Sequence, residues 1–219
     1  MDALLSNQKP VHLSENILDL SPLPFLMVDL PNHQKVNETL KEITKKLADK
    51  DVLIKKNQEI HDENVDIWEH TNAIVPINKI LNVKNDDIKY LKKFILEKTL
   101  ELSNIGSKTS KWSININESW IQTYQNGDFL NLHNHVFGPN ANPKIKNWSG
   151  AYYVDSGHTD KDKAYSGIIT FHVNGHNWNI KPRPGLLLMW PSHLLHHVNP
   201  YFGEDERIMV SWNVQAKPV

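Results

Sequence analysis

The sequence has no cysteine in its 219 residues. That absence excludes a disulfide framework, a thiolate zinc site, an iron–sulfur cluster and a cysteine nucleophile. It leaves imidazole and carboxylate groups as the strong metal ligands that the chain can offer. A chain of this length buries about 70% of its unfolded surface, so it can fold around an apolar core without a cross-link. We expect one domain over residues 1–219.

Arginine is also scarce, and the net charge is close to zero. Only Arg183 and Arg207 stand among 24 basic residues, which balance 25 acidic residues to a net charge of -1. Such a balance, without a long basic run, argues against a nucleic-acid partner. No apolar run approaches the ~20 residues that span a membrane, and the first residues lack the basic-then-apolar layout of a signal peptide. We therefore expect a cytoplasmic protein without a membrane partner.

Glycine is missing from the first part of the chain, since all nine glycines lie at or after Gly106. Six of the seven tryptophans also lie in the later part. This change in composition predicts a helical N-terminal part, residues 1–108, followed by a β-strand core, residues 109–219. Apolar spacing and capping residues place the two clearest helices after Asn37 and after Asn85.

The core consists of short apolar segments separated by Gly, Pro, Asn and Ser turns. Such segments without intervening helices are typical of an antiparallel sandwich or barrel. Residues 186–190 are apolar on both faces, which predicts that the N-terminal helices cover one sheet. We predict an α+β, mainly β fold. The expected strands cover residues 25–29, 112–117, 119–125, 129–135, 150–154, 167–173, 178–180, 185–190 and 207–214.

Histidines gather in the core, where eight of the twelve fall between His133 and His197. Because side chains alternate along a strand, His133 and His135 point the same way and can occupy neighbouring positions on one metal ion. A third ligand then comes from His193, His196 or His197, directly after a later strand. Three imidazoles suit iron, zinc, copper or nickel, so the residues alone leave the metal open.

Arg207 opens the last expected strand, where period two places Arg207, Ser211 and Asn213 on one face. Because most basic residues of this chain are lysines, an arginine at this place indicates that the planar guanidinium group is needed. A guanidinium binds a carboxylate through two hydrogen bonds, which an ammonium cannot do. An ordinary surface ion pair with Glu204 or Asp205 is the other interpretation.

Several segments together resemble the 2-oxoglutarate- and iron(II)-dependent oxygenases of the prolyl-hydroxylase-like type, and most closely a subgroup from bacteria and bacteriophages. In the first segment Tyr124 and a glycine turn precede His133, in the order of that family. The second is the aromatic pair within residues 149–153. The third has a Pro-Gly turn and an apolar strand, followed by His196 and then Arg207.

The resemblance implies a double-stranded β-helix, which is the jelly-roll fold of cupin-like proteins. It implies Fe(II) as the metal, with 2-oxoglutarate and O2 as cosubstrates. The metal would be held by His133, His135 and His196, with His197 beside them or in place of His196. The cosubstrate-binding residues would be Arg207, Ser211, Tyr153 and Tyr124.

One residue departs from the family pattern. The wider family has an aspartate where this chain has His135, although the closest subgroup shares the histidine. Asp128 and Asp155 are the nearby carboxylates that could serve instead, but neither has the family's spacing. We therefore keep His135 as the expected second ligand.

The reaction implied by the resemblance converts 2-oxoglutarate to succinate and CO2 while a substrate C–H bond is hydroxylated. The substrate is a small molecule or a peptide, and no catalytic residue is implied beyond the metal site. Trp148 and Trp178, beside turns, are the tryptophans most suited to substrate contact.

Other functions remain open at this point. A cupin-like three-histidine metal enzyme that does not use 2-oxoglutarate explains the histidines but not Arg207. A non-catalytic β-sandwich binding module leaves the clustering of the histidines to chance. An oxygenase fold that binds metal without turnover is a further possibility. The sequence does not give the oligomeric state.

Overall fold

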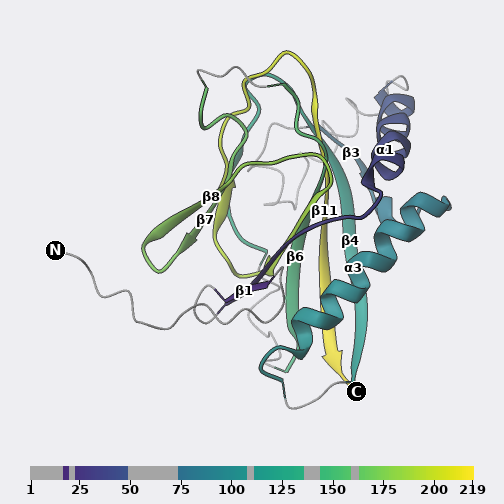
Figure 1. The fold of residues 1–219 in the computed structure, drawn as a ribbon, viewed down its shortest axis with the longest axis vertical. Helices are drawn as coiled ribbons and strands as arrows, with labels where there is room; N and C mark the ends of the chain where they lie inside the picture. The colour runs from purple at the N-terminus through teal and green to yellow at the C-terminus, as the bar shows by residue number, and fades with distance from the viewer. Residues whose placement is uncertain (1–16, 20–22, 49–73, 108–110, 136–143, 159–162) are drawn as a thin grey trace, which may run out of the picture.

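The computed structural model describes residues 17–19, 23–48, 74–107, 111–135, 144–158 and 163–219. Two antiparallel sheets and two helices dominate this part of the chain (Figure 1). The helices are α1 (His33–Ala48) and α3 (Asp86–Asn104), with a short 3-10 helix, η2, at Ile80–Asn82. The strands are β1 (Ile17–Asp19), β2 (Pro24–Asp29), β3 (Ile74–Asn78), β4 (Trp112–Tyr124), β5 (Leu130–His133), β6 (Lys146–Asp155), β7 (Ile169–Val173), β8 (His176–Ile180), β9 (Leu186–Pro191), β10 (His196–Val198) and β11 (Arg207–Pro218). No described helix is long and apolar enough to cross a membrane.

The chain passes back and forth between the two sheets as it runs through the β core. The seven-stranded sheet has the order β1-β2-β9-β6-β11-β4-β3, and the four-stranded sheet has the order β5-β10-β7-β8. From β4 to β11 each connection crosses to the other sheet, except the β7–β8 hairpin. This winding is the double-stranded β-helix that the sequence led us to expect.

Two apolar cores hold the layers together. One lies between the helices and the large sheet, and the other lies between the two sheets. Figure 1 shows α1 and α3 along one face of the large sheet, with β7 and β8 on its other side. Strand β11 serves both cores, because Val210 and Trp212 belong to the first and Met209 to the second. The predicted packing of helices on one sheet is confirmed.

The two predicted helix starts had different outcomes. Asn85 caps α3 as expected, since its Oδ1 accepts hydrogen bonds from the backbone N–H groups of Asp87 and Ile88. The prediction that Asn37 caps a helix is wrong, because α1 already begins at His33. Asn37 is instead buried within α1, where its Oδ1 accepts a hydrogen bond from the Tyr152 hydroxyl.

The strands differ from the sequence prediction at a few places. The two strands expected over 112–117 and 119–125 form the single strand β4, with a bulge opposite the step from Asn213 to Val214. Strand β10 was not predicted as a strand, because it has only three residues. Within residues 1–108, strands β1, β2 and β3 extend the large sheet.

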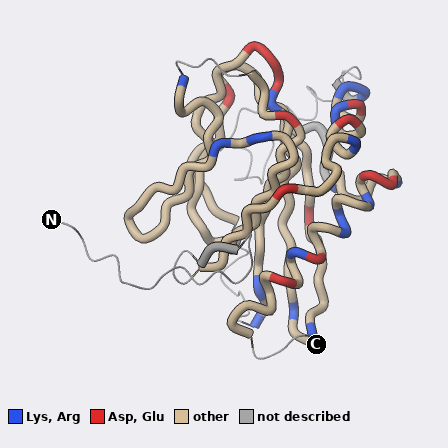
Figure 2. The backbone as a smooth tube through the Cα atoms, in the orientation of Figure 1, with Lys and Arg blue, Asp and Glu red and all other residues tan. Residues whose placement is uncertain are grey.

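Charged residues are most frequent on the helices. Figure 2 shows both signs interspersed along α1 and α3, whereas the β7–β8 hairpin is nearly uncharged. Interspersed charge gives no extended single-sign surface on this face. That pattern agrees with the expected lack of a nucleic-acid partner, which stays a prediction.

Candidate metal and cosubstrate site

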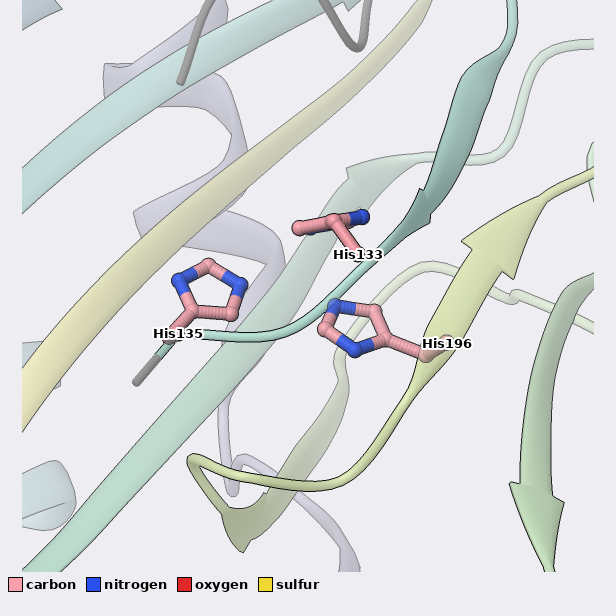
Figure 3. Close-up of side chains that lie close together, drawn as sticks. All are labelled: His133, His135 and His196. Atoms are coloured by element: carbon pink, nitrogen blue, oxygen red, sulfur yellow. The ribbon is translucent and has the colours of Figure 1, made fainter. Parts of the chain in front are cut away.

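Three histidines from two parts of the sequence meet between the two sheets (Figure 3). One ligand atom of each of His133, His135 and His196 lies within 4.8 Å of the others. Their ring centroids are 4.2 Å apart for His133 and His196, 5.0 Å for His133 and His135, and 5.2 Å for His135 and His196. Imidazoles bind a metal at about 2 Å, so small rotations of these rings would bring them onto one ion.

Strand pairing and backbone contacts fix the positions of the three rings. His133 lies directly across from His196 in the antiparallel pair of β5 and β10. His135 follows the end of β5, and its backbone N–H donates to the Ser192 carbonyl at 2.8 Å. The expectation that both histidines of the H-x-H motif face the same site is confirmed, although His135 lies just beyond the strand.

Hydrogen bonds to carbonyl groups set the tautomers of two ligands. Nδ1 of His133 lies 2.7 Å from the Asn131 carbonyl oxygen, and Nδ1 of His196 lies 2.9 Å from that of Leu194. A carbonyl oxygen only accepts, so Nδ1 carries the proton in both rings. Nε2 is then the nitrogen whose lone pair can bind a metal, and each carbonyl orients its ring.

Burial favours the neutral imidazoles that a metal requires. His196 is buried, with its ring 4.9 Å from the Trp190 ring and 5.5 Å from the Phe171 ring. Loss of solvation lowers the pKa of His196 well below its ordinary value. The same effect, followed by the nearby charge of His133, lowers the pKa of His135 to about 3. The rings therefore need not lose a proton before binding a metal at neutral pH.

The other candidate ligands point elsewhere. The Asp128 carboxylate accepts a hydrogen bond from the Gln125 backbone at 2.8 Å. The Asp155 carboxylate pairs with Lys41 on the helix side. His197 neighbours His196 on β10, so its ring points to the opposite face of the sheet. There His197 Nδ1 lies 2.9 Å from His172 Nε2, away from the three-histidine group.

Arg207 is fully buried at the start of β11. Its guanidinium carbon lies 4.7 Å from the centre of the Tyr124 ring and 5.4 Å from that of the Tyr153 ring. Its Nε and Nη1 have no hydrogen-bond partner among the described residues, and neither have the two tyrosine hydroxyls. The surface ion pair with Glu204 or Asp205 is excluded, because a buried guanidinium cannot form it. Strand alternation predicted only the shared face of Arg207, Ser211 and Asn213, and the structure shows that Arg207 is buried.

A buried, unpaired cation is costly unless a ligand completes it. Four unsatisfied polar atoms beside one another, all able to donate, fit a carboxylate that accepts several hydrogen bonds. Burial raises the pKa of Tyr124 and Tyr153, while the charge of Arg207 opposes that rise. The tyrosine hydroxyls thus keep their protons and can donate to an anion.

Ser211 does not lie next to Arg207. Met209 stands between them on the same face of β11, and the Ser211 hydroxyl donates to the Gln122 side chain at 3.3 Å. The expected contact of Ser211 with the cosubstrate stays a prediction. Trp148 is buried on the helix side, where its indole N–H donates to Ser103, so it is not available for the substrate.

A second polar group, which sequence reasoning missed, lies farther along the same inner face. The Ser149 hydroxyl donates to Asn213 Oδ1 at 2.7 Å, and Asn213 Nδ2 donates to the Glu118 carboxylate at 2.9 Å. Ser192 Oγ lies 2.9 Å from Ser149 Oγ. Period two, counted back from Tyr124 along β4, would have placed Glu118 on this face.

Comparison with known proteins agrees with this geometry. Residues 118–213, somewhat less than half of the chain, match the profile of a family described as "Putative 2OG-Fe(II) oxygenase". Over these residues the chain is similar to the core of 2-oxoglutarate- and iron(II)-dependent oxygenases. The match includes the three histidines as well as Arg207, Tyr124 and Tyr153. A search of curated protein sequences gives no match to the oxygenase.

Solved structures show the same fold at low sequence identity. The oxygenase is similar to a prolyl-4-hydroxylase from Pseudomonas putida, with 15% identity, a TM-score of 0.61 and coverage of 92% of this chain and 96% of that one. A viral collagen prolyl hydroxylase from Paramecium bursaria Chlorella virus-1, solved as a 2OG complex, has 16% identity and a TM-score of 0.59, over 89% and 96% of the two chains. HygX from Streptomyces hygroscopicus, with nickel and 2-oxoglutarate bound, has 11% identity and a TM-score of 0.53, over 89% and 83%.

Proposed function

We propose that His133, His135 and His196 hold the Fe(II) of this oxygenase and that Arg207 binds the distal carboxylate of 2-oxoglutarate. The observation that carries the second assignment is the buried guanidinium with two unsatisfied nitrogen atoms. The convergence of the three imidazoles supports the first. When bound, the iron and its cosubstrate supply the oxidising chemistry that converts 2-oxoglutarate to succinate and CO2 and hydroxylates a substrate.

The protein's own residues bind, orient and exclude water. Arg207 neutralises the distal carboxylate, and the unpartnered hydroxyls of Tyr124 and Tyr153, whose rings lie beside the guanidinium, are additional donors. Phe171 and Trp190 shield the His196 ring, which keeps solvent from that side of the metal site. This arrangement would hold 2-oxoglutarate in one orientation relative to the iron before the substrate binds.

Two of the three other functions are less consistent with these contacts. A three-histidine enzyme that does not use 2-oxoglutarate gives no reason for an unpaired guanidinium in the core. A binding module without metal gives no reason for three imidazoles whose ligand atoms converge. The substrate, whether a small molecule or a peptide, and the cytoplasmic location stay predictions.

The test is to add Fe(II) and 2-oxoglutarate to the full-length protein without oxygen. The expected result is a weak visible charge-transfer band from the keto acid bound to iron, followed by formation of succinate when oxygen is admitted. A fully metallated protein that shows neither the band nor succinate would refute the assignment of both sites.

A further inference from the structure

A second set of unsatisfied polar atoms lies at the opposite end of the inner face from Arg207. Asn147 Oδ1 and the Trp190 indole N–H are buried and have no hydrogen-bond partner among the described residues. Trp190 belongs to the core between the sheets, and alternation along β6 places Asn147 on the same face as Ser149. Buried polar atoms normally have a hydrogen-bond partner, so these two atoms indicate a ligand other than the carboxylate expected beside Arg207.

This end of the inner face is well separated from Arg207. On β11, Asn213 lies across from Glu118 on one neighbouring strand and from Ser149 on the other. It stands six residues after Arg207, which along a strand is about 20 Å. The two sets of unsatisfied atoms thus belong to two different subsites within the space between the sheets.

Glu118 supplies the charge of the second subsite. Its half-buried carboxylate accepts a hydrogen bond from Asn213, which the Ser149 hydroxyl in turn orients. In the parts of the chain that the structure describes, no lysine or arginine forms an ion pair with Glu118. A carboxylate held in this way has lone pairs left for a ligand, and it lacks a protein cation.

The second subsite adjoins the metal ligand His135 on two sides. The Trp120 ring, two residues from Glu118 on the same face of β4, stacks on the His135 ring with centroids 6.1 Å apart. The Ser192 carbonyl accepts the His135 backbone N–H, and the Ser192 hydroxyl contacts Ser149. A molecule bound at Glu118 would therefore extend past His135 toward the metal.

We propose that this second subsite binds the substrate, and that the substrate carries a cationic amino or guanidino group. The Glu118 carboxylate and Asn147 Oδ1 only accept hydrogen bonds, so their complement is a donor, and the charge of Glu118 selects a cation. The Trp190 indole N–H only donates, so the substrate also needs an acceptor at that point. The face of Trp120 that does not stack on His135 is suited to the same charge through a cation–π contact. This inference rests on the proposed function, because it takes the three histidines as the metal ligands.

The test uses the full-length protein with Fe(II) and 2-oxoglutarate bound, in the absence of oxygen. Free L-lysine and N-acetyl-L-lysine methylamide are titrated while the charge-transfer band is followed, with the corresponding norleucine compounds as neutral matches. The lysine probes should perturb the band in a saturable way and bind about tenfold or more tightly than the norleucine probes. The free and capped forms distinguish an amine of a small molecule from a side chain of a peptide.

Two variants of Glu118 separate binding from folding. Glu118→Gln should weaken the lysine probes about tenfold or more and leave iron content and 2-oxoglutarate affinity unchanged. Glu204→Gln, at an exposed position, is the matched control and should change none of these values. Glu118→Lys should reverse the preference, so that N-acetyl-L-glutamate methylamide binds better than the lysine probe.

The outcomes distinguish this inference from the proposed function. If the wild-type protein gives no band, the proposed function fails before the substrate question arises. If the band forms but lysine and norleucine probes act equally, the cationic subsite is wrong. Equal loss of all probes in Glu118→Lys, without the reversal, would likewise show that Glu118 has only a structural role.

Discussion

Replacing Arg207 by lysine is the most direct test of the proposed 2-oxoglutarate site. The guanidinium is fully buried between two tyrosine rings, and two of its nitrogen atoms have no partner among the described residues. Lysine keeps the positive charge but offers a single ammonium in place of the planar fork. We therefore expect Arg207→Lys to weaken 2-oxoglutarate binding and to leave the iron in place.

The size of the effect follows from the hydrogen bond that the substitution removes. When a two-point pair with the carboxylate becomes a one-point pair, one charge-assisted hydrogen bond disappears, and such a bond contributes about 1.5–3 kcal/mol. Since about 1.4 kcal/mol corresponds to a tenfold change, the dissociation constant of 2-oxoglutarate should rise by about tenfold to a hundredfold. Iron affinity should not change, because Arg207 and the three histidines make no direct contact among the described interactions.

Anaerobic titration of the Fe(II) protein with 2-oxoglutarate, followed by the charge-transfer band, measures this constant, and elemental analysis measures the iron. The chain provides its own control, because Arg183 is exposed and forms an ion pair with Asp29 outside the core. Arg183→Lys should bind 2-oxoglutarate like the wild type. Unchanged 2-oxoglutarate affinity in Arg207→Lys, or loss of iron from that variant while it stays folded, would refute the assignment.

Four further substitutions test the metal site and the fold. His135→Ala should lose its iron, whereas His197→Ala should keep it, because the His197 ring is on the other face of β10. The iron content of each variant is measured. Full iron occupancy in His135→Ala would show that another residue is the second ligand. Gly150→Ala should lower the melting temperature, since its Cβ would lie 2.2 Å from the Trp212 ring and overpacking costs about 1–3 kcal/mol. Asn85→Ala removes the cap of α3, and chemical denaturation should show a loss of about 1 kcal/mol.

Strand alternation made much of the site predictable from the sequence. A strand has a period of two residues, so the sequence alone could place Arg207 and Asn213 on the same face of one strand. The same rule put His133 and His135 toward one site, and the distal His196 followed from the family resemblance. These predictions needed only local regularity and the order of the motifs.

Long-range contacts explain what could not be predicted. The local sequence around Asn37 resembles a helix cap, but the Asn37 amide oxygen accepts a hydrogen bond from the Tyr152 hydroxyl on a distant strand. Strand β10 is too short to leave a periodic pattern, and it exists because β5 and β7 flank it. The partnership of Glu118 with Asn213 depends on the register of β4 and β11, which no local pattern reveals.

The register of β11 links the two subsites of the oxygenase. Arg207 and Asn213 share one face of one strand, so their positions in the sequence must differ by an even number. A one-residue insertion between them would turn one of the two toward the helices and remove it from the space between the sheets. The bulge in β4 lies beyond Glu118, toward Ile116, so the pairing from Tyr124 to Glu118 stays in step with β11. The strand thus sets a fixed distance between the proposed positions of the cosubstrate carboxylate and the substrate cation. The proposed metal ligand His135 lies between them, because it stacks on Trp120, which pairs with Ser211.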